Sequence, residues 1–76
     1  MTSLFHFIGL DTNQQAEHVW EGRYLTYRTE DNYLIALYDL GEFYAEIFYI
    51  LKTNKISHIH GFRARSGLIP YSVDSR

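Results

Sequence analysis

Residues 41–62, GEFYAEIFYILKTNKISHIHGF, decide the fold of this chain. The stretch is rich in β-branched and aromatic residues, contains no proline, and is interrupted by the polar run at residues 52–55. This composition favours strands over a helix, and the polar run is typical of a turn. The stretch therefore predicts a long β-hairpin.

The residues before this hairpin extend the sheet. Residues 24–29 and 33–39 also alternate apolar and polar side chains, so strands are expected at 24–29, 33–39, 43–51 and 56–63. Short polar turns between neighbours indicate an antiparallel meander. Nearer the N-terminus, Asp11 or Thr12 can cap a helix at about 12–21, with Gly22 as its stop. The prediction is an α+β fold: one short N-terminal helix on a four-stranded antiparallel β-meander, with the apolar run 4–10 as an arm or a fifth strand.

The pattern of alternation assigns each side chain to a face of the sheet, provided that every turn holds an even number of residues. The expected core face carries Ala36, Ala45 and Ile47, covered by the helix stripe of Ala16, Val19 and Trp20. His58, His60 and Phe62 are expected on the same face. A three-residue turn at 52–55 would move them to the other face. That other face is predicted to hold an apolar interaction surface, made of Ile35, Leu37, Tyr44, Phe48, Ile50 and Ile59.

The length of the chain limits the core. With 76 residues, the chain is expected to form a single domain, 1–76, that buries only roughly 60–65% of the surface its unfolded form exposes. It has no cysteine, so no disulfide can reinforce that core. A sheet that is apolar on both faces needs a second cover, and a symmetric pair is the commonest solution. A homodimer is therefore expected, with a different partner protein as the alternative.

Charge excludes several classes of partner. The formal net charge is −2 and both signs are scattered, which is unlike a binder of duplex DNA or of an anionic membrane. The apolar run near the N-terminus is too short for a signal peptide, and no run approaches the roughly 20 apolar residues of a membrane span. We expect a cytoplasmic protein that needs no cofactor.

Three residues could support chemistry. His58 and His60 are two apart on a strand, a spacing that can chelate zinc or another transition metal, and Glu46 could join them as a ligand or as an acid-base group. The alternative is that both histidines lie at the rim of an edge strand and that Glu46 forms a buried ion pair with Arg28 or Arg63.

If Glu46, His58 and His60 act together, the protein is a small metal-dependent or acid-base enzyme. Two other functions remain open. Sheet aromatics such as Tyr44 and Phe48, near arginines, could stack on single-stranded RNA, although the acidic balance speaks against it. The preferred interpretation is a non-enzymatic protein–protein interaction module that associates with itself, of the accessory, antitoxin or inhibitor type.

The C-terminal half resembles a group of small bacterial proteins of about this length whose activity is not characterised. The shared features are the Gly-acid-aromatic-aromatic-x-Glu pattern that ends at Glu46, a hairpin, and the Pro70-Tyr71 pair. Where those proteins tend to carry Lys or Arg on the last strand, this chain has His58 and His60. The resemblance implies a recurring structural unit over residues 41–71 and no activity.

Overall fold

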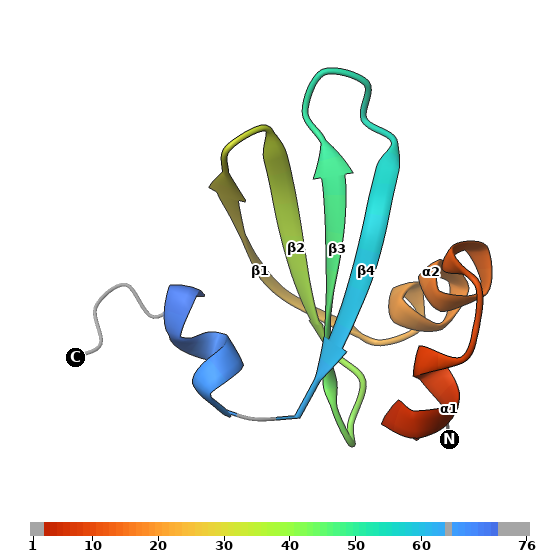
Figure 1. The fold of residues 1–76 in the computed structure, drawn as a ribbon. Coiled ribbons are helices and arrows are strands. Elements are labelled where there is room, and N and C mark those ends of the chain that lie inside the picture. The colour runs from red at the N-terminus through yellow and green to blue at the C-terminus, as the bar shows by residue number, and fades with distance from the viewer. Residues whose placement is uncertain (1–2, 64, 72–76) are drawn as a thin grey trace.

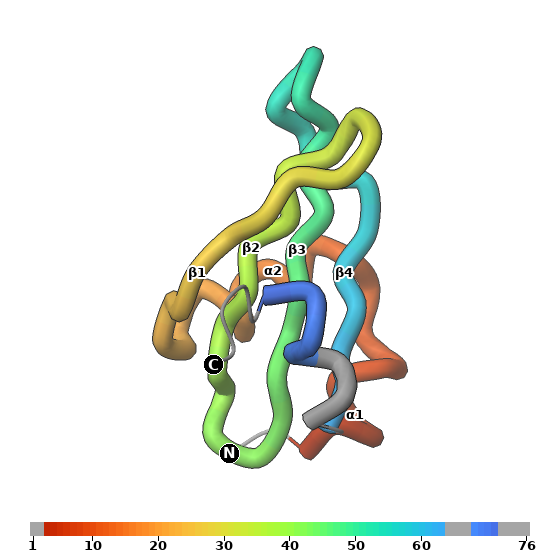
Figure 2. The backbone as a smooth tube through the Cα atoms, turned by 90° about the vertical axis from the view of Figure 1, so that its left-hand side faces the viewer, coloured from red at the N-terminus to blue at the C-terminus, as the bar shows by residue number. Residues whose placement is uncertain are grey.

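A computed structural model describes residues 3–63 and 65–71 of the chain. The elements in order are α1 (Leu4–Ile8), α2 (Thr12–Trp20), β1 (Arg23–Glu30), β2 (Tyr33–Asp39), β3 (Tyr44–Ile50), β4 (Ile56–Phe62) and the 3₁₀-helix η1 (Arg65–Tyr71). The four strands form one antiparallel sheet in the order β1-β2-β3-β4. In Figure 1 this sheet stands between α1 and α2 on one side and η1 on the other, and Figure 2 shows η1 in front of the sheet. The predicted α+β meander is confirmed.

Tight turns set the register of the first three strands. Glu30 pairs with Tyr33, so the first hairpin has a two-residue turn, in which Asp31 adopts a positive φ of 54°. The second hairpin closes with a hydrogen bond from the Leu40 amide to the Phe43 carbonyl, 2.9 Å long, and Gly41 takes a φ of 96°. Positive φ costs glycine little, which explains a glycine at this turn. These turns put Ala36 and Ile47 directly opposite each other, on the face that α1 and α2 cover.

The N-terminal run is a helix rather than a strand or an extended arm, so that prediction was wrong. Ser3 caps α1 by accepting a hydrogen bond from the His6 amide at 3.1 Å. The helix buries Phe7 against the sheet, with its ring 5.1 Å from that of Phe43. In α2, Asp11 and Gln14 form a reciprocal capping box, which fixes the predicted start of that helix.

The core lies between the helices and the sheet. We call the covered side of the sheet the helix face. Its buried cluster consists of Phe7, Val19, Phe43, Ala45 and Ile47. In the predicted α2 stripe, Ala16 and Val19 are buried, but Trp20 is 53% exposed because it ends the helix.

The last strand faces the opposite way from the prediction over most of its length. Ile56 still pairs with Tyr49, but the register shifts at this point and His58 pairs with Phe48. Ser57 is the additional residue of a β-bulge, and one additional residue moves every following side chain to the other face. His58, His60 and Phe62 therefore leave the helix face, and Ile59 joins it.

The bulge also divides the predicted apolar interaction surface. Ile59 packs against the helix-face core, while Ile35 and Leu37 remain on the other side of the sheet and are buried there, 0% and 2% exposed. The 3₁₀-helix η1 lies on that other side of the sheet, where it contacts β1. We call this side of the sheet, which carries η1, the hook face. The six-residue surface predicted from the sequence is therefore not present as one exposed patch.

Candidate functional site

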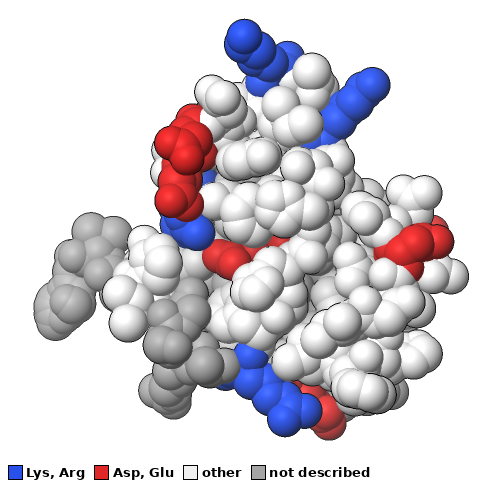
Figure 3. All heavy atoms as spheres, viewed as in Figure 1, with Lys and Arg blue, Asp and Glu red and all other residues white. Residues whose placement is uncertain are grey.

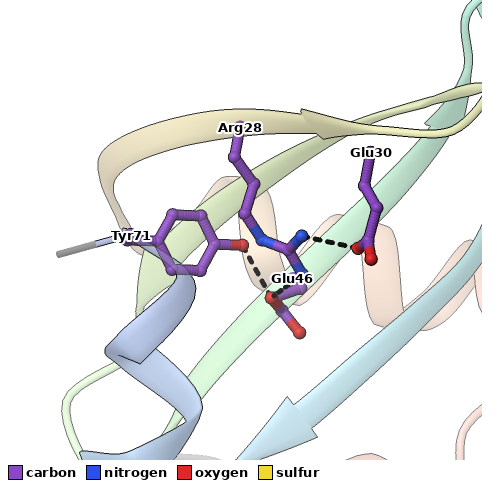
Figure 4. Close-up of polar contacts among 4 residues, drawn as sticks. All are labelled: Arg28, Glu30, Glu46 and Tyr71. Atoms are coloured by element: carbon purple, nitrogen blue, oxygen red, sulfur yellow. Dashed lines mark hydrogen bonds and ion pairs between the residues drawn. The ribbon is translucent and has the colours of Figure 1, made fainter. Parts of the chain in front are cut away.

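A buried carboxylate occupies the middle of the hook face. Glu46, on β3, is only 5% exposed. Its Oε2 accepts a hydrogen bond of 2.6 Å from the hydroxyl of Tyr71, at the end of η1. The same oxygen lies 3.5 Å from a guanidinium nitrogen of Arg28, on β1 (Figure 4). These contacts attach η1 to the sheet, and they satisfy a charge that would be costly to bury alone.

Arg28 links Glu46 to a second carboxylate. Its other terminal nitrogen lies 2.6 Å from Glu30, and its guanidinium carbon lies 5.1 Å from the centre of the Tyr71 ring. Of the two predicted ion-pair partners of Glu46, the structure brings Arg28 to the carboxylate and leaves Arg63 exposed. One guanidinium therefore lies between two carboxylates.

Burial and the neighbouring carboxylate change the pKa of the Tyr71 hydroxyl. Burial raises the pKa of the Tyr71 hydroxyl far above its ordinary value, and the hydrogen bond to Glu46 and the charge of Glu46 raise it further. Ionised Tyr71 would place a second negative charge beside Glu46 in a partly dry site. Tyr71 thus remains a hydrogen-bond donor at neutral pH.

Aromatic rings surround this cluster on the hook face. The His58 ring stacks on Phe48 with 4.2 Å between centroids, and Tyr33 contacts both rings. On the other side of Glu46 along β3, the rings of Tyr44, Phe62 and His60 form a second stack with 5.6 Å steps. Figure 3 shows acidic atoms between uncharged side chains near the centre of the viewed face.

The flipped strand brings the two histidines to the Glu46 side. His60 pairs directly with Glu46 across the strands, and both histidines are exposed. In the part of the chain that the structure describes, however, no three His, Cys, Asp or Glu side chains are grouped so that they could hold a metal ion. Stacking on Phe48 and Phe62 directs the imidazoles to aromatic neighbours. The predicted metal or acid-base constellation therefore shares a face, but its side chains do not converge.

A second candidate lies on the helix face, where the helices leave the sheet uncovered. Both helices contact β4 at one edge of the sheet, and α2 also contacts β1. Toward the opposite edge, Tyr24 and Tyr27 of β1 are 52% and 56% exposed. Tyr24 packs edge-on against Tyr38 at 5.6 Å, and the Trp20 indole N–H lies 3.4 Å from the hydroxyl of Tyr49. We call this group the tyrosine surface: Trp20, Tyr24, Tyr27, Tyr38 and Tyr49.

Charge is excluded from the strand positions of the helix face. The paired rows of this face contain apolar residues, tyrosine, threonine and glycine, and none of them carries Asp, Glu, Lys or Arg. Partial burial raises the pKa of the Tyr38 hydroxyl, and Tyr49 and Tyr24 add to the rise.

Sequence reasoning missed the tyrosine surface because strict alternation along β1 puts Tyr24 and Tyr27 on opposite faces. The register shifts between Tyr24 and Thr26, so Leu25 is the additional residue of a second bulge. The bulge brings Tyr24 to the same side as Tyr27 and Tyr38. The signal that could have identified the surface was the spacing of three tyrosines on adjacent strands without a charge between them.

Comparisons with known proteins identified no similar protein. No family model matches the chain, and neither the curated proteins nor the solved structures contain a match. Among the described residues, none of the helices has the length and apolar character needed to cross a membrane.

Proposed function

We propose that this protein is a non-enzymatic interaction module that associates with a second copy of itself through the tyrosine surface. The observation that supports this most strongly is the exposure of β1 on the helix face, where Tyr24 and Tyr27 are more than half exposed on a face whose strand positions carry no charge. Exposed faces of monomers normally carry charged residues, and an aromatic patch without them is typical of an interface.

Tyrosine and tryptophan suit this role physically. Their rings contribute a large apolar area with few rotatable bonds, and their polar tips can hydrogen-bond across an interface. Trp20 at the end of α2 stands beside Tyr49, so ring area from the helix layer continues onto the sheet. Such residues supply most of the binding energy in many interfaces.

A second copy is the favoured occupant because the surface is complementary to itself. Tyrosine hydroxyls both donate and accept hydrogen bonds, and a surface without charge can meet its own copy without repulsion between like charges. A two-fold axis through the surface would pair each tyrosine with its counterpart or a neighbour. The formal charge of −2 per chain is small enough to permit this.

Sedimentation velocity over a range of concentrations tests the proposal. The unaltered protein should shift from monomer to dimer as concentration rises. The variant Tyr27→Lys places a charge in the surface and should remain monomeric. The control Ile69→Lys changes an apolar residue of η1 that is 67% exposed, against 56% for Tyr27, and should dimerise as the unaltered protein does.

Two results would contradict the proposal. One is a monomer at all concentrations in the unaltered protein. The other is equal loss of the dimer in both lysine variants, because that would attribute association to general apolar exposure rather than to the tyrosine surface.

A further inference from the structure

The carboxylate of Glu46 uses only one of its oxygens within the described part of the chain. Both of its contacts, to Tyr71 and to Arg28, go to Oε2. Among the described residues, the only side-chain nitrogen or oxygen that is fully buried without a partner is Nε of Arg28. Within the described residues no hydrogen bond or ion pair reaches Oε1, and Figure 4 shows this oxygen pointing away from Tyr71. A nearly buried carboxylate thus keeps one acceptor open.

The charge around this oxygen favours a cation. Arg28 is shared between Glu46 at 3.5 Å and Glu30 at 2.6 Å, so its closer contact is to Glu30. Counted as ionised groups, two carboxylates and one guanidinium leave one negative charge. Part of that charge lies in a site of low exposure, where an electrostatic interaction is stronger than in bulk water.

From these observations we propose that Glu46 Oε1 binds an alkylammonium group, such as a lysine side chain or a small primary amine, between the two aromatic stacks of the hook face. The rings of Phe48 and His58 on one side, and of His60 and Phe62 on the other, supply apolar contact for the alkyl chain. An ammonium group suits the site better than a guanidinium, because one free oxygen cannot form a bidentate pair. This site lies on the face opposite the tyrosine surface and does not depend on self-association.

An NMR titration with n-butylammonium tests the proposal in the full chain at constant ionic strength. We expect saturable shifts of the His60, Phe48 and Tyr71 resonances in the millimolar range. n-Butanol, which has the same shape without the charge, should cause no saturable shift. A lysine-containing peptide is titrated in parallel. Tighter binding of the peptide identifies a protein side chain as the ligand, and equal binding identifies a free amine.

Three variants separate binding from folding. Glu46→Gln should weaken butylammonium binding at least about tenfold, because it removes one charge-assisted hydrogen bond. Glu30→Gln alters an exposed residue and releases Arg28 to neutralise Glu46, so it should also weaken binding while the fold persists. Glu17→Gln, an exposed change on α2, is the control and should bind as the unaltered protein does.

The proposal is overturned if the unaltered protein shows no saturable shift up to tens of millimolar amine. It is equally overturned if butanol shifts the same resonances to the same extent, or if Glu30→Gln binds as tightly as Glu17→Gln.

Discussion

The hydroxyl of Tyr71 is the single group whose removal isolates the attachment of η1 to the sheet. In Tyr71→Phe the ring remains beside Arg28, but Glu46 loses its 2.6 Å hydrogen bond. A hydrogen bond to a charged group contributes about 1.5–3 kcal/mol to stability. Because Tyr71 is only partly buried, we expect a smaller contribution, about 1–2 kcal/mol. For a domain of this size, the melting temperature should fall by at least about 4 °C.

Urea unfolding followed by circular dichroism measures this change. The midpoint should fall in Tyr71→Phe while the denaturant slope stays constant. Tyr27→Phe removes an exposed hydroxyl on the opposite face and should stay within about 0.5 kcal/mol of the unaltered protein. In a double-mutant cycle, Tyr71→Phe and Glu46→Gln should show a coupling energy of at least about 0.5 kcal/mol. A Tyr71→Phe protein as stable as the unaltered one, or a coupling energy of zero, would refute the role of this contact.

Two other predictions follow from the described contacts. Because the pKa of Tyr71 is raised in the folded state, its contribution to stability is complete below the ordinary tyrosine value of about 10 and is lost as pH rises toward the raised value. The free energy of unfolding should therefore decline above that pH, by at most about 1.4 kcal/mol per unit for this group, and Tyr71→Phe should flatten the decline. If Tyr71→Phe leaves the decline of the free energy of unfolding with pH unchanged, the decline belongs to other tyrosines. Separately, Gly61→Ala would place its Cβ 2.8 Å from Leu4 Cδ1 and 3.2 Å from Phe7 Cδ2, so it should cost about 1–2 kcal/mol by displacing α1, as measured in urea. Gly9→Ala, whose nearest contact is 3.6 Å away, is the control, and equal effects of the two changes would contradict the packing of α1.

Local patterns in the sequence predicted most of the elements. The four strands and α2 carry strong signals, since alternation and capping residues act over short distances. α1 carried none, because a five-residue helix is too short to show a period of 3.6, and its apolar residues suit a strand equally well. Only packing of Phe7 onto the sheet distinguishes these alternatives.

The faces of the outer strands were harder to predict than the strands themselves. Turn lengths fixed β2 and β3 correctly, but bulges at Leu25 and Ser57 change the alternation within β1 and β4. Neither residue is a glycine, so composition does not mark the bulge. As a result, the sequence could offer Arg28 or Arg63 as the ion-pair partner of Glu46, but it left the face of His58 dependent on the length of the turn at 52–55.

The attachment of η1 was predictable only in part. Glu46 was expected to form a buried ion pair with Arg28 or Arg63. The donor that completes the cluster, Tyr71, is 25 residues away along the chain. Nothing in a local pattern connects two residues at that separation.

The fluorescence of Trp20 tests self-association at the tyrosine surface most directly. Trp20 is the chain's one tryptophan and is 53% exposed at the margin of that surface. Its emission should move to shorter wavelength as concentration rises, in parallel with the doubling of mass measured by light scattering, and Tyr27→Lys should abolish both changes. A mass that doubles while the emission of Trp20 remains unchanged, or a mass that never doubles, would contradict the assignment of this surface as the interface.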